Sequence, residues 1–270
     1  MSLTKSISQF IDNTLIDLGR QFRWSYLPPL MIYVAAGISG LTGIVGVFFI
    51  KDYLNLSAAF LAGLGFWAGI PWALKMPLGH LVDLIWQRKN YLVFVGAGLI
   101  ALSVIIMYGL IIHTETMASI LKVETWFIVS ALLAPVGYVT QDVVADAMTV
   151  EAVPSTDDQG NKYSTQQIKI MHTTMQTLGR FAIIGGFVLV ALVNVVMFTG
   201  VSALSEPEKI EIYGRIYLYA LFIPIVSVSG VFLAMYLKRQ RLEKLKKSGV
   251  SDEELKKLMA EYGVGTQPNW

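Results

Sequence analysis

Long apolar stretches alternate with short polar segments along the chain of 270 residues. A helix needs roughly 20 apolar residues to cross a hydrocarbon core of about 30 Å. About six stretches meet this requirement, near residues 26–50, 56–81, 91–112, 125–150, 170–201 and 216–237. The pattern therefore predicts an all-α protein, a polytopic transmembrane helical bundle.

The composition agrees with this prediction. Hydrophobic residues make up 54% of the chain and charged residues only 15%, which is too few charges to cover a soluble globule of this size. The chain has no cysteine and three histidines, so a thiolate metal site is excluded and we expect no metal or other cofactor. It also has no nucleic-acid-binding signature, so the expected surroundings are the lipid bilayer and small solutes.

The cations are distributed unevenly between the two sides of the predicted bundle. Cytoplasmic loops of membrane proteins carry an excess of Lys and Arg. With a cytoplasmic N-terminus, the outer loops hold four cations that are largely offset by acidic residues: Lys51, Lys122, Lys209 and Arg215. The inner segments hold more: Lys5, Arg20, Arg23, Arg88, Lys89, Lys162, Lys169 and the basic tail from Lys238. We therefore expect a multi-pass inner or plasma membrane protein with both termini in the cytoplasm.

The spacing of polar residues divides the chain into three parts. Residues 1–25 have apolar side chains at helical spacing, which indicates an interfacial amphipathic helix or a helical cap over the mouth of the bundle. Residues 26–237 form the six-span bundle. Residues 238–270 are a charged cytoplasmic tail or central linker, with pairs such as Glu253 and Lys257 at helical spacing.

Small residues recur in the predicted spans. They include Gly40 and Gly43 in the first, Gly63 in the second, and Gly185 and Gly186 in the fifth. Small residues let helices approach closely in membranes. We therefore expect helix contacts at these positions.

Acidic residues inside the fourth predicted span are the first functional signal. Tyr138, Asp142 and Asp146 recur every four residues, which predicts one shared helix face. Charged side chains inside a membrane are costly, and they usually face a cavity or a partner. These residues are therefore candidates for a site within the bundle.

Other spans carry polar residues that could join this face. Gln176 and Arg180 share the same spacing in the fifth span, and Lys75 lies at a comparable depth in the second. At about 1.5 Å of rise per residue, Asp142 and Arg180 both lie roughly 12 to 15 Å from the cytoplasmic boundary. We therefore predict that Asp142 and Arg180 are coupled. The functional interpretation is a substrate and ion-coupling site, and the alternative is a set of structural ion pairs.

Two segments resemble a known family. The first comprises residues 48–59, residues 71–79 with a Pro-Trp pair ahead of Lys75, and then Asp83, Arg88 and Lys89. The second is residues 141–151, with its aspartate pair followed by a glutamate. Together they resemble the folate-biopterin transporters of the major facilitator superfamily, whose shared loop motif is similar to residues 79–89.

The resemblance implies a secondary transporter, a symporter of folate or pterin-like molecules driven by protons. The matched segments and the spacing and depth arguments together give these candidate substrate or ion-coupling residues: Trp72, Lys75, Tyr138, Asp142, Asp146, Gln176 and Arg180. The implied gating-loop residues are Gly79, Asp83, Arg88 and Lys89. Such transporters have two six-span halves. The resemblance thus predicts that this chain is the N-terminal half of a longer protein, or else pairs with a second copy.

Two other classes of function remain open from the residues alone. An intramembrane enzyme could use Asp142 and Asp146 to hold a divalent metal. However, basic Lys75 and Arg180 at the same depth would compete with the metal, so we do not expect an enzyme. A membrane subunit without transport activity is the other alternative.

Overall fold

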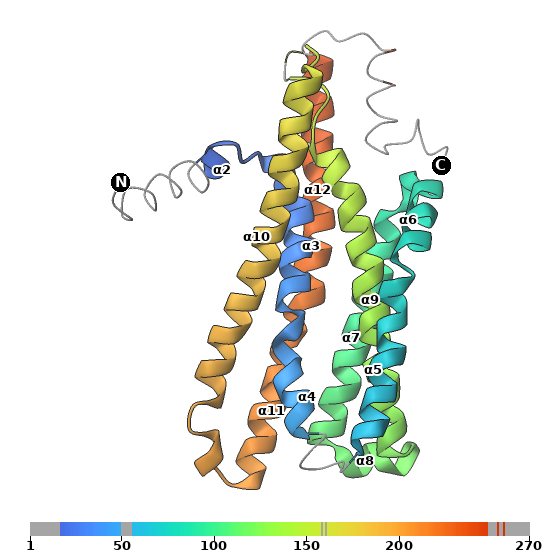
Figure 1. Ribbon diagram of the computed structural model, residues 1–270, viewed down its shortest axis with the longest axis vertical. Helices are drawn as coiled ribbons and strands as arrows, with labels where there is room; N and C mark the ends of the chain where they lie inside the picture. Colours follow the sequence, from blue (N-terminus) through green and yellow to red (C-terminus); the bar gives the residue numbers. More distant parts are fainter. Residues whose placement is uncertain are drawn as a thin grey trace.

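The computed structural model describes residues 17–49, 56–157, 159, 161–247, 253 and 256, which form an elongated all-α bundle (Figure 1). Most of the predicted helix over 1–25 lies outside these residues, as do Lys51 and Lys257. The helices are α2 (Asp17–Arg20), η2 (Trp24–Tyr26), α3 (Leu27–Ile38), η3 (Ser39–Thr42), α4 (Gly43–Phe49), α5 (Ala58–Ala73), α6 (Lys75–Leu84), η5 (Trp86–Arg88), α7 (Asn90–Ile112), α8 (Thr114–Ile120), α9 (Val123–Ala152), α10 (Thr165–Phe198), η6 (Val201–Ala203), α11 (Glu206–Ala220) and α12 (Phe222–Lys247).

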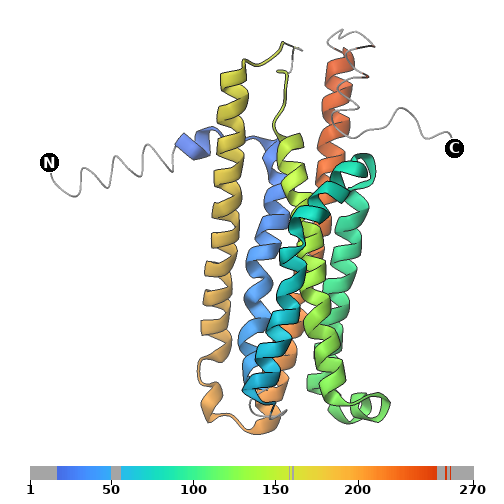
Figure 2. The ribbon, with the colours of Figure 1, turned by 45° about the vertical axis from the view of Figure 1, so that its right-hand side comes forward.

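Within the described residues, five helical stretches are long and apolar enough to cross a membrane. They are Ala58–Leu84, Asn90–Ile112, Val123–Ala152, Thr165–Ala203 and Glu206–Lys247. They run along the long axis of the bundle, except that the end of the first stretch, α6, turns obliquely to it (Figure 2). The all-α polytopic fold is thereby confirmed, and the chain is an integral membrane protein.

The first predicted span is a chain of short helices rather than one long one. A 3-10 turn, η3, separates α3 from α4 at Ser39–Thr42. Gly40 and Gly43 lie at this turn, and glycine weakens a helix because its backbone loses more freedom on folding than that of other residues. The first span therefore follows the predicted range but consists of two short α-helices joined by a 3-10 turn.

The second span is interrupted between α5 and α6. Pro77 has no N–H to donate to the carbonyl of Ala73, and its ring clashes with a regular helical turn at that point. The chain responds by leaving the helix at Leu74, where φ is −85° and ψ is 7°. Lys75 is the first residue of α6 as a result, so this break sets its position.

Two glycine pairs show where the helices approach most closely. Gly37 of α3 faces Gly186 of α10, and Gly96 of α7 faces Gly137 of α9. A methyl group at Gly96 would lie 2.7 Å from the carbonyl oxygen of Gly137, which is too close for any side chain. The predicted contact at Gly186 is confirmed, whereas Gly43, Gly63 and Gly185 have open space in place of a contact.

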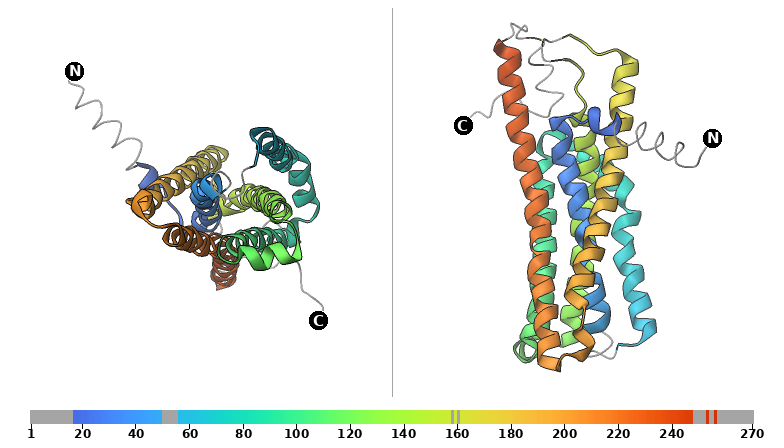
Figure 3. Two further views of the ribbon diagram at one scale, coloured as in Figure 1. Left: turned by 90° about the horizontal axis from the view of Figure 1, so that it is seen from below. Right: turned by 90° about the vertical axis from the view of Figure 1, so that its left-hand side faces the viewer.

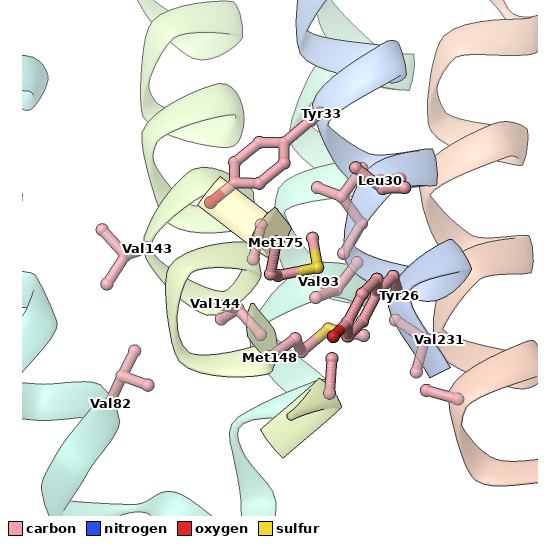
Figure 4. Packing of buried hydrophobic residues seen from close by; sticks show 14 of the residues in the cluster. Tyr26, Leu30, Tyr33, Val82, Val93, Val143, Val144, Met148, Met175 and Val231 are labelled. Carbon is pink, nitrogen blue, oxygen red and sulfur yellow. The ribbon is translucent and has the colours of Figure 1, made fainter. Parts of the chain in front are cut away.

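Helix α3 lies at the centre of the bundle and packs against α9, α10 and α12 (Figure 3). Apolar side chains from these helices form one core around Tyr26, Met148 and Met175 (Figure 4). A second core joins α7 and α11 around Ile100 and Ile216. Helix α5 contacts α9 and buries none of its residues, so it forms one edge of the bundle.

Candidate functional site

A lysine bridges two aspartates where α6 meets α9. The Lys75 ammonium lies 2.6 Å from a carboxylate oxygen of Asp142 and 2.9 Å from one of Asp146. The two aspartates are one helical turn apart on α9, so a single amine can reach both. We call Lys75, Asp142 and Asp146 the Lys75 triad.

The three side chains of the Lys75 triad differ in their exposed fraction. The side chain of Asp142 is 10% exposed, that of Lys75 39% and that of Asp146 49%. Asp142 is thus covered by the bundle, while Lys75 and Asp146 can be reached from outside it. A ligand or a proton could therefore meet the triad without any helix moving apart.

Tyr33 adds a fourth polar group that the sequence analysis missed. Its hydroxyl, on α3, donates a hydrogen bond of 2.6 Å to Asp146. The Tyr33 ring packs on Gly179 of α10, where an added methyl group would lie 2.8 Å from the ring, and the ring projects from α3 toward α9 (Figure 4). A tyrosine in the middle of an apolar span was the available signal, because a buried phenol usually finds a partner.

Arg180 does not pair with the aspartates. The ion pairs of Asp142 and Asp146 among the described residues are both with Lys75. Arg180 and Gln176 lie on α10 and are exposed, and Gly179, the neighbour of Arg180, packs on Tyr33. The predicted coupling of Asp142 and Arg180 stays a prediction that does not rest on an ion pair between them, because counting residues fixes depth and leaves open which helix lies opposite.

The two aromatic residues predicted for the site lie in different surroundings. Trp72 is exposed in the last turn of α5, just before the break that positions Lys75. Tyr138 instead lines a half-open pocket of about 170 Å³ with Thr42, Ser130 and Tyr217. Side chains eight residues apart on a helix differ by roughly 80° in direction, which explains why Tyr138 and Asp146 face different neighbours.

The predicted gating-loop residues also separate into two groups. Gly79 packs near Val143 of α9, whereas Asp83 and Arg88 are exposed. Lys89 is buried, forms an ion pair with Glu151 and lies 3.7 Å from the centre of the Trp86 ring. Burial lowers the pKa of the Lys89 ammonium, and the Glu151 carboxylate opposes that shift.

Glu151 joins three segments at this end of the bundle. Besides Lys89, it accepts a hydrogen bond of 2.6 Å from Lys238 of α12. The side chain of Glu151 is only 3% exposed and that of Lys89 only 2%. We call Lys89, Glu151 and Lys238 the Glu151 cluster, which ties the start of α7 and the end of α9 to α12.

Comparisons with known proteins give one relative. The chain is 30% identical over 138 residues to a protein of Synechocystis sp. named "Folate-biopterin transporter". The aligned region covers 50% of this chain and 26% of that relative, so the chain matches about a quarter of its length. No protein-family model matches the chain. No solved structure matches it either.

Proposed function

We propose that this chain moves a small organic solute across a membrane, or forms one half of a protein that does so. The observation that carries this proposal is the Lys75 triad, an ion-paired group inside two apolar spans that remains half accessible. Ionisable groups in membrane spans mark substrate and ion pathways. Similarity to a protein named as a transporter supports the same class.

The triad suggests a mechanism by exchange of partners. Its two carboxylates share one ammonium, so an anionic group on a substrate could draw Lys75 away from Asp146, the more exposed aspartate. A proton taken up by Asp146 would then replace the positive charge that the departing ammonium had supplied. Binding of the anion and of the proton would thereby be coupled with no net change in charge.

A folate or pterin-like molecule is the substrate we propose. The name of the relative suggests it, and the residues around the triad are compatible with it. Trp72 presents an exposed aromatic ring near Lys75, and Arg180 offers a further exposed cation. A flat heteroaromatic ring with an anionic tail could use a ring for stacking and cations for its carboxylates.

A second six-span half is the partner we propose. Apolar side chains stand exposed along α5 and α10, including Phe66, Trp67, Phe187 and Val196. Lipid or another helical half could cover them. The half would come from the same longer protein or, failing that, from a second copy of this chain, and the Lys75 triad would then face the interface.

The direct test is uptake of labelled folate and biopterin by proteoliposomes under a proton gradient. This chain is compared with the same chain extended by whatever the source DNA encodes downstream, and each with its Lys75→Gln variant. We expect uptake that depends on the gradient and on Lys75. Well-folded protein that takes up neither solute in either form would overturn the pterin assignment. Uptake that Lys75→Gln leaves unchanged would remove the triad from the mechanism.

A further inference from the structure

The half-open pocket beside Tyr138 is separate from the Lys75 triad. It has a volume of about 170 Å³, lies between η3, α7, α9 and α11, and contains none of the triad residues in its described lining. Its other lining residues are apolar, and its polar ones are Thr42, Ser103, Ser130, Tyr138 and Tyr217. We call it the Tyr138 pocket.

Small side chains on facing helices leave this space open. Ala131 and Ala134 of α9 and Thr42 of η3 line it. The helices α7 and α9 cannot close over it, because a methyl group at Gly137 would already lie 2.8 Å from the side chain of Ile100. A water molecule needs roughly 10 to 15 Å³ of such volume, so the pocket has room for a small organic molecule.

The hydroxyl groups around the pocket differ in whether they already have partners. The Ser103 hydroxyl donates to the Ser130 carbonyl oxygen at 2.8 Å, and the Ser130 hydroxyl donates to that of Ser103 at 2.9 Å. Tyr217 makes a hydrogen bond with Thr42. The partly exposed Tyr138 makes none with another described residue, and its phenol is close enough to that of Tyr217 to interact electrostatically. The Tyr138 hydroxyl is therefore the group that an occupant can meet.

The lining indicates the chemical class of the occupant. None of the residues described along it is charged, so an ion would lose its hydration without gaining a counter-charge. Val104, Met107 and Phe127 give the wall an apolar and partly aromatic surface. Cavities of about 150 Å³ in other proteins admit benzene. A purely apolar molecule, however, would leave the Tyr138 hydroxyl without a partner, which is costly.

We propose that the Tyr138 pocket binds a small, uncharged aromatic molecule that carries a hydrogen-bonding group, with the Tyr138 hydroxyl as the partner of that group. The ring would pack against Phe127 and the aliphatic side chains of α7. Because the pocket is half open, such a molecule can enter without separating the helices. The proposal does not depend on the Lys75 triad or on transport.

The test is saturable binding of para-fluorophenol to the full chain in detergent micelles, measured by fluorine NMR. The second probe is para-fluorotoluene, which has the same shape and lacks the hydroxyl. Loss of one hydrogen bond in Tyr138→Phe should weaken binding of para-fluorophenol about fivefold and leave that of para-fluorotoluene unchanged. Benzoate has a similar ring with a negative charge, and it should not displace para-fluorophenol.

A substitution that fills the pocket separates binding there from partition into the micelle. Ala131→Leu should weaken binding of both probes at least about tenfold, because the larger side chain occupies the space of the ring. Its thermal stability should equal or exceed that of the parent, since the substitution fills an open space. Ala191→Leu makes the same change at an exposed position of α10 outside the described lining, and it should bind both probes as the parent does.

Three results would overturn the proposal. Probe binding that does not saturate, or that Ala131→Leu leaves unchanged, would show partition into the micelle alone. Equal effects of Tyr138→Phe on the two probes would favour a purely apolar occupant such as a lipid chain. Displacement by benzoate would contradict the uncharged class. Ala134→Leu fills the same pocket and keeps the test decisive even if Ala131→Leu does not fold.

Discussion

The two charged clusters on α9 have opposite composition and opposite surroundings. The Lys75 triad has one cation between two carboxylates, and two of its three members are 39% or more exposed. The Glu151 cluster has one carboxylate between two cations, and its side chains are at most 18% exposed. The carboxylates of both clusters lie on α9, within about three helical turns of one another.

We expect this difference in burial to separate a structural role for the Glu151 cluster from the proposed functional role of the Lys75 triad. A buried ion pair cannot exchange partners cheaply, because each ion would be left without water or a counter-charge. The Glu151 cluster therefore serves to hold α7, α9 and α12 together. The Lys75 triad can change partners at lower cost, since a ligand or water can replace a lost contact.

The largest expected effect is the loss of the shared carboxylate in the buried cluster. Glu151→Gln leaves Lys89 and Lys238 close together without a counter-charge, and should lower the free energy of unfolding by about 3 to 5 kcal/mol. Titration with a denaturing detergent, followed by helical signal, measures this change. A variant as stable as the parent would show that the Glu151 cluster is not needed for stability. Burial would then not distinguish the roles of the two clusters.

The next effect is functional rather than structural. Lys75→Gln leaves Asp142 and Asp146 facing each other, but a proton or water can relieve the repulsion because Asp146 is half exposed. Only Asp142 of the two is buried, so we expect a loss of thermal stability that is small beside that of Glu151→Gln, together with at least about a tenfold loss of uptake, the size of one lost charge-assisted contact. Unfolding comparable to that of Glu151→Gln would place the triad among the structural ion pairs.

The fold was predictable because span length and apolarity are local properties. The predicted spans 91–112 and 125–150 agree closely with α7 (Asn90–Ile112) and α9 (Val123–Ala152). The break at Leu74 follows from Pro77, a local rule that was available in the sequence. Continuous apolar composition concealed it, because hydropathy does not register a helix that bends within the membrane.

The depth of the site residues along their spans was predictable from the sequence. The helix that each side chain faces was not. Counting along the chain placed Lys75, Asp142 and Arg180 at one level, and Lys75 and Asp142 do meet. Which cation faces Asp142 depends on how the helices are arranged around the bundle, which no local pattern encodes. Gly37 and Gly96 illustrate the same limit, since their role as contact points exists only once α3 and α7 have neighbours.

A smaller effect is expected at the edge of the triad. Tyr33→Phe keeps the ring that packs on Gly179 and removes the hydroxyl that donates to Asp146. The loss of one hydrogen bond to a carboxylate should cost about 1.5 to 3 kcal/mol at most, less where water replaces it. Uptake should persist at a reduced rate, because Asp146 keeps its ion pair with Lys75. An uptake rate equal to that of the parent would show that Tyr33 takes no part in the exchange of partners.

The smallest effect is expected for an ion pair that is exposed and lies on a single helix. Glu211 and Arg215 of α11 are one turn apart at 2.5 Å, with side chains 62% and 55% exposed. Glu211→Gln should change the free energy of unfolding by no more than about 0.5 kcal/mol, because solvent screens such a pair and ordering two long side chains opposes it. The same detergent titration that is used for Glu151→Gln measures both values. If the two substitutions cost the same, burial would not be what distinguishes the charged clusters of this bundle, and the structural role assigned to Glu151 would lose its basis.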